Sequence, residues 1–284
     1  MNFIKFSLIV CMVGVGSCPT AAPVPVAGWT GFYAGINGGY ANTHNEAHAR
    51  LSTVRTLPSA ASTSALAAAT SVTAGTSSFS SNKDSFIGGG QIGYLYSFNQ
   101  FVLGVEADIQ GITPGTEAVA AQQVVAIPTF RTSRIASNLS LTQSIDYLGT
   151  VRARIGVLAT PSLLFAATGG YAYGGIRSDT DLTQSYLGTA NNLVRTFTSN
   201  GSSSSIQNGW TVGGTLEWRF QGQWSTKLEY LYYDLDSLKY RSTPLTSLIN
   251  GGPDAGNPLF VNAVSTTSRF NGQIARLGIN YLFA

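Results

Sequence analysis

The sequence predicts an all-β fold, an eight-stranded antiparallel transmembrane β-barrel. Three observations support this prediction. Apolar and polar residues alternate with a period of two over segments longer than most soluble strands, which indicates strands with one apolar face. Only 10% of the 284 residues are charged, less than half of the roughly 25% found in soluble domains. Short and long connections also alternate along the chain, as they do in membrane barrels.

The first 22 residues have the layout of a secretory signal peptide. Lys5 precedes an apolar run from Phe6 to Val15, and small residues follow this run. The run is too short to cross a membrane as a helix. We therefore assign residues 1–22 to a signal peptide, residues 23–28 to a proline-rich linker and residues 29–284 to the barrel.

Both cysteines, Cys11 and Cys18, fall within or next to this export signal. The exported domain is therefore expected to contain no disulfide bond. The segment Val15-Gly16-Ser17-Cys18 resembles the lipobox that precedes a lipidated cysteine in bacterial lipoproteins. Two processing routes stay open, namely cleavage near Ala22 without a lipid and lipidation at Cys18.

Four strands are expected in the first half of the barrel domain. Each places large apolar side chains at alternate positions, with small, polar or charged residues between them. In chain order these strands are residues 29–40 with Phe32 and Ile36, 85–98 with Ile92 and Tyr94, 101–110 with Leu103 and Val105, and 144–158 with Val151 and Ile155.

Four more strands follow in the second half. The alternation is clearest in the second of these, where Val212 and Leu216 are separated by small residues. The four strands are residues 163–176 with Phe165 and Tyr171, 207–220 with Trp210 and Trp218, 224–238 with Leu228 and Tyr230, and 269–283 with Leu277 and Ile279.

The connections between these strands differ sharply in length. Hairpin turns of a few residues join the second and third, fourth and fifth, and sixth and seventh strands. The other connections are nearly free of charge and cover about residues 41–84, 111–143, 178–206 and 239–268. Such long loops are uncommon in a compact soluble domain. They are typical of an outer-membrane barrel, which has short periplasmic turns and, in this case, four long external loops.

Aromatic residues of the apolar face gather near strand ends, as Trp218, Phe220 and Trp224 do. Such clusters are typical of the aromatic girdles at the two membrane interfaces. We therefore expect the apolar face to contact lipid and the polar face to fill the lumen. This orientation explains the low charge content, and closing the sheet leaves no unpaired edge in the lipid.

Five segments of the predicted strands carry a recognisable pattern. They are GWTGFYAG at 28–35, GTVRARIG at 149–156, GGYAY at 169–173, GWTVGG at 209–214 and KLEYLYYD at 227–234. These segments resemble the small outer-membrane immunogenic-protein and porin family of Gram-negative bacteria, which is related to the OmpA-like eight-stranded barrels. The resemblance covers the strands but not the long loops. It implies that the protein is a surface antigen located in the cell outer membrane.

The last predicted strand is similar to the C-terminal signal read by the barrel-insertion machinery. The residues that carry this similarity are Arg276, Gly278, Tyr281 and Phe283. Ala284 departs from the pattern because the aromatic residue is next to last rather than terminal. The expected partners are therefore outer-membrane lipid and this machinery. The sparse and scattered charges predict no nucleic-acid partner.

Nine charged residues are expected to face the lumen, where their signs nearly balance. Two interpretations follow, either an ion-pair network that closes the barrel or a charged constriction that selects solutes. An eight-stranded lumen is narrow enough for side chains to fill it, which favours the network. The nine residues are Glu106, Asp108, Arg152, Arg154, Glu217, Arg219, Lys227, Glu229 and Arg276.

Candidate chemistry is limited to three residues after the first strand. His44, Glu46 and His48 lie close together in the sequence and are candidate metal or haem ligands. A flexible loop rarely presets coordination geometry, so we expect them to be solvated and predict no metal, no cofactor and no catalytic residues. Some members of the family that the chain resembles are reported to bind haem.

The sequence therefore predicts a non-enzymatic outer-membrane barrel with a structural or surface-exposed role and a lumen plugged by ion pairs. Two alternatives stay open. One is a narrow porin for small solutes, and the other is a protein that binds haem or a host ligand through its loops.

Overall fold

The computed structural model describes residues 28–56, 61–113, 117–128, 133–188, 193–248 and 256–283. The predicted signal peptide and most of the predicted linker lie outside these residues, so the processing site stays a prediction. The elements are β1 (Gly31–Thr56), α1 (Ala61–Gly75), β2 (Ser77–Phe98), β3 (Phe101–Ile112), β4 (Glu117–Ala126), β5 (Arg134–Thr160), β6 (Leu163–Leu187), β7 (Leu193–Gln221), β8 (Trp224–Arg241), β9 (Leu245–Leu248) and β10 (Pro258–Phe283).

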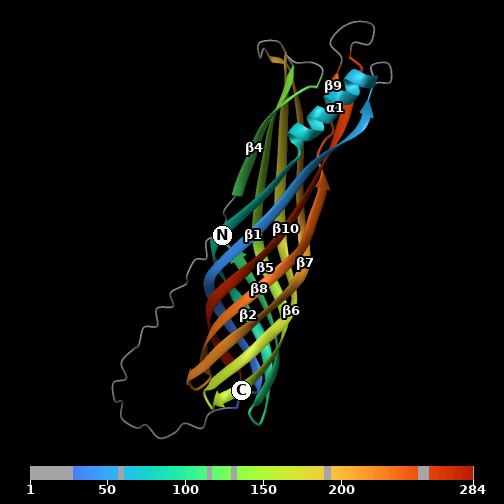
Figure 1. The fold of residues 1–284 in the computed structure, drawn as a ribbon. Coiled ribbons are helices and arrows are strands. Elements are labelled where there is room, and N and C mark those ends of the chain that lie inside the picture. The colour runs from blue at the N-terminus through green and yellow to red at the C-terminus, as the bar shows by residue number, and fades with distance from the viewer. Residues whose placement is uncertain are drawn as a thin grey trace.

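Eight of the strands close into an antiparallel barrel (Figure 1). Their order around the ring is β1-β2-β3-β5-β6-β7-β8-β10, and β10 pairs back onto β1 from Phe32↔Phe283 to Thr56↔Phe260. The short strands β4 and β9 pair with β5 and β10 outside this ring. The predicted eight-stranded antiparallel barrel is confirmed. Among the described residues, no helix is long and apolar enough to cross a membrane.

The apolar face of the strands points outward in the half of the barrel near the short turns. Phe32, Ile36 and Phe86 are 67–71% exposed, although burial would be favourable for such side chains in water. The intervening polar residues, such as Thr150 and Asn280, are buried in the lumen. The predicted orientation of the two faces is therefore present in the structure.

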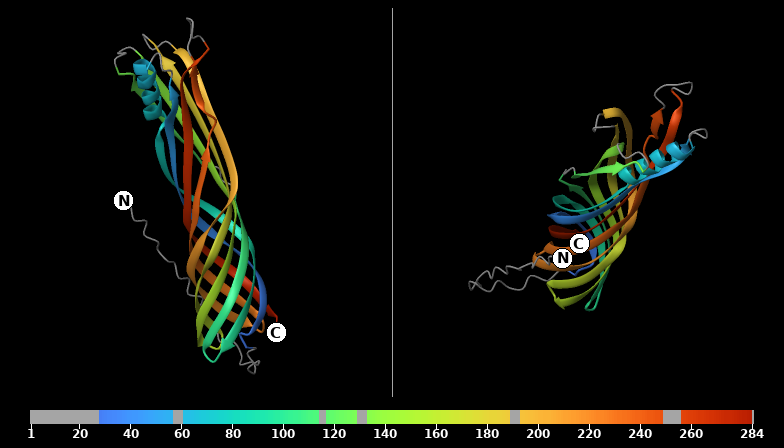
Figure 2. Two further views of the ribbon diagram at one scale, coloured as in Figure 1. Left: turned by 90° about the vertical axis from the view of Figure 1, so that its right-hand side faces the viewer. Right: turned by 45° about the horizontal axis from the view of Figure 1, so that its top comes forward.

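The strands continue far beyond their predicted ends and form a tall extension at one end of the barrel (Figure 2). β1 reaches Thr56 instead of residue 40, and β5 begins at Arg134 instead of residue 144. β6 and β7 stay paired up to Leu187↔Leu193. Much of the chain predicted as loop is therefore strand. In these segments small Ser, Thr and Asn residues line the outer face and alternate with buried residues, so the period of two continues.

Helix α1, which the sequence analysis did not anticipate, completes the wall of this extension. β3 ends at Ile112, so the upper part of β2 pairs in the sheet only with β1, and β4 pairs only with β5. α1 packs against β1, β4, β5 and β10 at this place. The Ser71 hydroxyl donates a hydrogen bond to Gln184 Oε1 at 2.6 Å and accepts one from Asn262 Nδ2 at 2.9 Å.

Candidate functional site

The candidate site is a layer of charged side chains inside the membrane-spanning part of the barrel. Each side chain occupies an alternate position of its strand and therefore points into the lumen. All nine residues predicted to face the lumen are buried, with exposed fractions no higher than 6%. They come from β3 (Glu106, Asp108), β5 (Arg152, Arg154), β7 (Glu217, Arg219), β8 (Lys227, Glu229) and β10 (Arg276).

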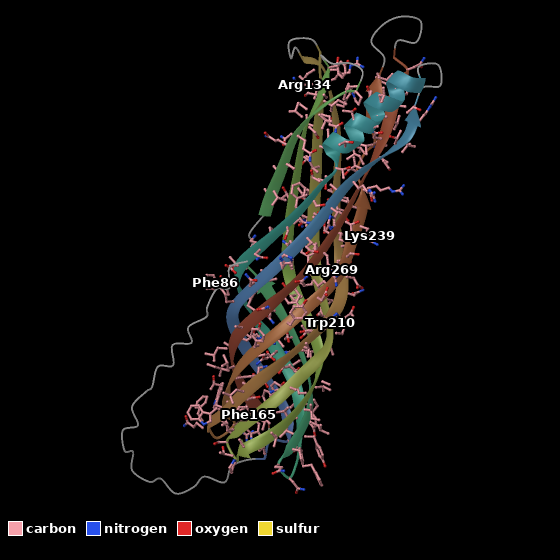
Figure 3. All side chains as sticks on the ribbon, viewed as in Figure 1. Phe86, Arg134, Phe165, Trp210, Lys239 and Arg269 are labelled. Carbon is pink, nitrogen blue, oxygen red and sulfur yellow. The ribbon has the colours of Figure 1, made fainter. Side chains whose placement is uncertain are left out.

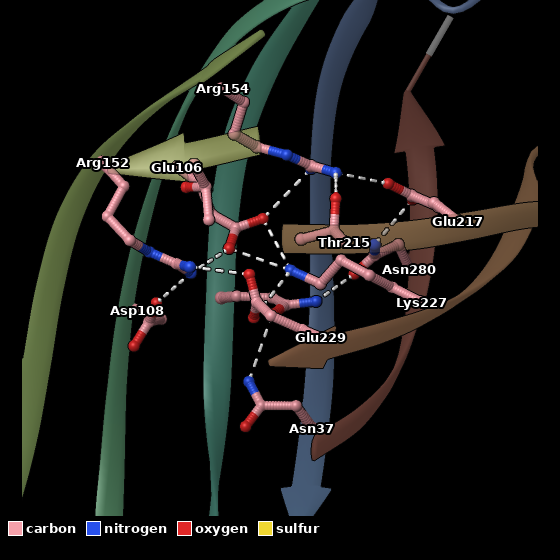
Figure 4. A network of polar contacts seen from close by, with 12 residues as sticks. Asn37, Glu106, Asp108, Arg152, Arg154, Thr215, Glu217, Lys227, Glu229 and Asn280 are labelled. Carbon is pink, nitrogen blue, oxygen red and sulfur yellow. Dashed lines mark hydrogen bonds and ion pairs between the residues drawn. The ribbon is translucent and has the colours of Figure 1, made fainter. Parts of the chain in front are cut away.

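Lys227 and Glu106 form an ion pair that crosses the barrel (Figure 4). β8 and β3 are four places apart in the ring of eight strands, so they lie on opposite walls. Lys227 Nζ is 2.7 Å from Glu106 Oε2 and 2.9 Å from Oε1. Both side chains are fully buried. The lumen is therefore occupied at this level by the two side chains and their contact.

The Arg152 guanidinium on β5 binds three carboxylates. Two belong to Glu106 and Asp108 on β3, and Arg152 Nη2 is 2.7 Å from Asp108 Oδ2. The third belongs to Glu229 on β8, whose Oε1 is 2.6 Å from Nη1. Arg152 thus joins neighbouring strands and also reaches a strand three places away in the ring.

Two further arginines extend the same network. Arg276 on β10 lies 3.0 Å from Asp108 Oδ2 and also contacts Glu229. Arg154 on β5 lies 2.9 Å from Glu217 Oε2 and 3.2 Å from Glu106 Oε2. Arg276 therefore ties β10 to both sides of the lumen, and Arg154 ties β5 to β7 and β3.

The network is balanced in charge. Four carboxylates (Glu106, Asp108, Glu217, Glu229) face four cations (Arg152, Arg154, Lys227, Arg276). Buried charges are tolerated when they are paired and hydrogen-bonded. The structure places the ninth predicted residue, Arg219, nearer the turn end, with its guanidinium 4.3 Å from the centre of the Trp29 ring. That distance is typical of a cation–π contact.

Neutral side chains supply hydrogen bonds that the sequence analysis did not assign. They sit at the same alternate, inward positions as the charges, so the period of two was the signal that could have found them. The Tyr33 hydroxyl donates to Glu106, Thr150 donates to Asp108 at 2.6 Å, and Ser225 and Asn280 donate to Glu217 at 2.6 and 2.8 Å.

Apolar layers lie on both sides of the charged layer. On the turn side the cluster includes Trp29, Val102 and Leu164. On the extension side it includes Tyr233 and Phe270, and a further apolar cluster packs under α1. A cavity of about 20 Å³ lies near Thr43, Lys83 and Gln143, which is room for about one water molecule. The described lumen is therefore packed above and below the ion pairs.

The three candidate metal ligands lie on the outer face of β1, not in a loop. The prediction of a loop was wrong here because β1 continues through these residues by pairing with β2 and β10. His44 Nε2 is 3.3 Å from Glu46 Oε1, whereas His48 Nδ1 contacts Ser78 Oγ at 2.8 Å. Within the described ranges, no group of three His, Cys, Asp or Glu residues could hold a metal ion.

The residues that resemble an insertion signal lie on β10. Arg276 belongs to the charged layer, and Gly278 faces the lumen close to Asn37. Tyr281 and Phe283 point outward, with ring centres 5.1 Å apart, and Trp224 packs on Tyr281 at 5.0 Å. These three rings form part of the aromatic girdle at the turn end of the barrel.

Comparison with known proteins agrees with this architecture. The family model described as outer membrane protein beta-barrel domain matches residues 8–255. The chain belongs to this family. It is also 30% identical over 275 residues to the 31 kDa outer-membrane immunogenic protein of Brucella melitensis biotype 1 and to the same-named protein of Brucella suis biovar 1. Each match covers 96% of this chain and 91% of the relative.

Solved structures of other outer-membrane barrels are also similar to this member of the family. OprG from Pseudomonas aeruginosa matches with a TM-score of 0.44 and 11% identity, over 91% of this chain and 98% of that chain. Ail of Yersinia pestis matches with a TM-score of 0.27 and 11% identity, over 87% of this chain and 99% of that chain.

Membership of the outer membrane protein beta-barrel domain family places the protein in the outer membrane of a Gram-negative cell. The outward-facing residues near the short turns, such as Phe165 and Trp210 in Figure 3, form the exposed apolar surface of the barrel. In outer-membrane barrels generally, the short turns face the periplasm and the longer connections face the external side.

Proposed function

We propose that the protein is a closed outer-membrane barrel with a structural and surface-exposed role, and that its lumen does not conduct solutes. The observation that carries this proposal is the contact between Lys227 and Glu106 on opposite walls of the barrel. A selective channel commonly lines its constriction with charges of one sign. Here opposite signs meet in the middle of the lumen.

The arrangement of the network makes spontaneous opening costly. Arg152 alone holds carboxylates from two strands, so widening the lumen at this level breaks several buried ion pairs together. Each separated charge would need water or another partner. The apolar layers next to the charges leave little room for that water. The packing therefore favours a permanently closed state.

The surface-exposed part of this role is assigned to the extension. Its outer face carries hydroxyl and amide side chains, as at Thr142, Thr198 and Asn200, which suits a wall in contact with water. The Brucella relatives are named immunogenic outer-membrane proteins. By analogy, we assign antigenic exposure to this wall of strands.

A non-enzymatic role is part of the proposal. The sequence predicts no catalytic residues, yet the folded chain brings Ser78 Oγ within 2.8 Å of His48 Nδ1. In the described part of the chain, the carboxylate of Glu46 contacts His44 instead of His48. The Ser78–His48 pair lies on an open strand surface, and none of the described residues supplies a third group to orient the imidazole, so the pair does not form a triad there.

Conductance in planar lipid bilayers tests the proposal. The purified wild-type protein is expected to give no stable conductance steps. Replacing both Glu106 and Arg152 with alanine removes the most connected part of the network, so this variant is expected to show small steps. The matched control replaces the exposed pair Asp146 and Arg177, whose charges are 3.6 Å apart on the outer wall, and is expected to stay silent.

The outcomes separate the alternatives. Large and stable steps from the wild-type protein would overturn the closed-barrel proposal and favour a narrow porin. Silence of both wild type and the Glu106/Arg152 variant would show that the apolar layers, and not the ion pairs, close the lumen. Binding of haem to the wild-type protein with no conductance would favour the ligand-binding alternative.

A further inference from the structure

Three exposed cations share one wall of the extension. Arg50 on β1 is paired in register with Ser265 on β10, and Ser265 is paired with Arg241 on β8. Two residues along β8, Lys239 is paired with Thr267. Partners in register point to the same face of a sheet, and all three cations are exposed. We call Arg50, Lys239 and Arg241 the cationic patch.

The cationic patch is not neutralised within the described residues. Arg50, Lys239 and Arg241 have no ion pair there, whereas the next cation toward the membrane, Arg269, is held by Asp234 at 2.7 Å. Figure 3 shows Lys239 and Arg269 along the same wall. The charge of the three patch residues therefore faces solvent.

The acidic side chains of the extension are spread over several strands. On the patch wall, Glu46 of β1 and Asp236 of β8 are exposed below the patch, on its membrane side. Asp179 and Asp181 are on β6, which is four places from β1 and two places from β8 in the ring. Both are paired in register with Ser202 and Asn200 of β7, not with a cation. Above Glu46 and Asp236, the described residues of β1, β8 and β10 include no acidic side chain, so the patch has a local excess of positive charge. Such a field steers an anionic partner toward the cationic patch.

The cationic patch lies too far above the membrane for the lipid headgroups of the outer leaflet to be its binding partner. On β1 the last aromatic residue of the lipid-facing series is Tyr40, and Arg50 follows ten residues later. At about 3.3 Å per residue and a strand tilt of about 40°, Arg50 lies roughly 25 Å above that girdle. The partner must therefore come from the external medium.

The side chains between the cations indicate the chemistry of this partner. Ser265 and Thr267 lie between β8 and β1 in the two rows of the patch. Hydroxyl groups can hydrogen-bond to sugars and sulfate oxygens. The ring in these two rows is the imidazole of His48, which is paired in register with Thr267 and contacts Ser78 Oγ, whereas nucleic-acid grooves generally stack successive bases on several aromatic residues. The rows therefore suit a charged glycan better than a nucleic acid.

We propose that the cationic patch binds a soluble, linear sulfated polysaccharide. Exposed ion pairs contribute little individually, so binding relies on several sulfates reaching several cations along the wall. It is therefore expected to weaken as salt screens the charges. The proposal rests on the proposed surface exposure of the extension, because only an external patch meets such a polymer in the cell.

Fluorescence anisotropy with the folded protein in detergent micelles tests the proposal, since this format does not depend on orientation in a cell. The probe is fluorescein-labelled dextran sulfate, and unsulfated dextran is the ligand control. The variant Arg50→Ser/Arg241→Ser is expected to weaken binding about fivefold. The matched control Arg134→Ser/Arg177→Ser removes two cations from β5 and β6 and is expected to change binding less than twofold.

Each other result has a defined meaning. Equal losses in the two variants, or equal binding of unsulfated dextran, would overturn the proposal. Single-stranded DNA binding as tightly as dextran sulfate, with the same sensitivity to Arg50 and Arg241, would show a general polyanion surface instead. Protease digestion on intact cells tests surface exposure separately, so a buried extension that still binds dextran sulfate in micelles would contradict only the proposed function.

Discussion

Lys227 and Glu106 are 121 residues apart in sequence, yet their charged groups meet across the barrel. Their pairing depends on the closure of the ring, which sets β8 opposite β3. Glu106 also pairs with Arg152, Arg154 and Arg276, so its carboxylate is shared among four cations. The charged layer therefore behaves as one unit in which the balance of signs matters more than any single pair.

Charge balance predicts the stability of variants in this layer. Lys227→Met leaves four carboxylates facing three cations, and an uncompensated buried charge costs about 3–5 kcal/mol when the site is dry. The double variant Lys227→Met/Glu106→Gln restores three of each sign and is expected to recover part of that loss. Urea unfolding of the protein in lipid vesicles, followed by tryptophan fluorescence, measures the free energy of unfolding of both variants. A double variant less stable than Lys227→Met would contradict the balance argument.

The lipid-facing orientation gives a second prediction. Leu216 points outward from the middle of the membrane part of β7 and lines an apolar groove with Leu228 and Tyr230. Leu216→Arg is expected to destabilise the folded barrel in vesicles by about 2–4 kcal/mol, because a charge at that depth faces hydrocarbon. Ser204→Arg, on the outer face of the same strand in the extension, is the control and is expected to change stability by less than about 0.5 kcal/mol.

The sequence alone suggests a different control, an arginine at the neighbouring lumen-facing residue Thr215. The structure argues against it. Thr215 is 6% exposed, and its hydroxyl accepts a hydrogen bond from Arg154 Nη2 at 3.2 Å. A new cation there would lie beside Arg154 in a layer that is already balanced. Equal folding of the Leu216→Arg and Ser204→Arg variants would contradict the orientation of this strand.

The anchoring of α1 gives a third prediction. Gln184 accepts a hydrogen bond from the Ser71 hydroxyl and donates one to the Ser71 carbonyl at 2.8 Å. Gln184→Leu removes both and leaves buried polar groups of α1 without these partners, which costs about 1–3 kcal/mol locally. Hydrogen exchange of residues 61–75 is expected to speed up by at least about fivefold, while the barrel strands keep their protection. Thr73→Ala, at an exposed position of α1, is the control, and unchanged exchange in Gln184→Leu would contradict the anchor.

The barrel was predictable from the sequence because lipid imposes a strict pattern on each strand. Every lipid-facing position must be apolar, so Val151 and Ile155 alternate with Arg152 and Arg154 over the whole membrane thickness. This constraint ends at the membrane surface. In the extension, water contacts the outer wall, and small polar residues there look the same in a strand as in a loop.

β5 shows why the extension was missed. Ile135 and Leu139 share the odd-numbered positions of Val151 and Ile155, yet the first two are buried inside and the last two are exposed on the outer face. A shift of register between Ile145 and Tyr147 turns the strand over, as β-bulges do. The apolar positions keep their period while their environment inverts from lipid to a packed core.

The members of the charged layer were also predictable, because their inward positions follow from the period of two. The ion-pair partner of each charged residue was not predictable. Arg276 reaches Asp108 across 168 positions of sequence, and this contact depends on ring closure and on the stagger between strands. The layer's neutral partners, such as Tyr33, were missed because only charged residues were considered at the inward positions.

The last prediction concerns the C-terminal strand. We propose that the barrel-insertion machinery reads Tyr281 and Phe283, which lie on the lipid-facing side of β10 at its periplasmic end. Tyr281→Ala/Phe283→Ala is expected to reduce assembly in cells several-fold while refolding into vesicles stays close to wild type, because only assembly in cells uses the machinery. Trp224→Ala removes a neighbouring girdle ring on β8, 5.0 Å from Tyr281, and serves as the control. Heat-modifiability on gels reports folded barrel in both settings, and equal losses in cells for the two variants would show that the rings act as membrane anchors alone.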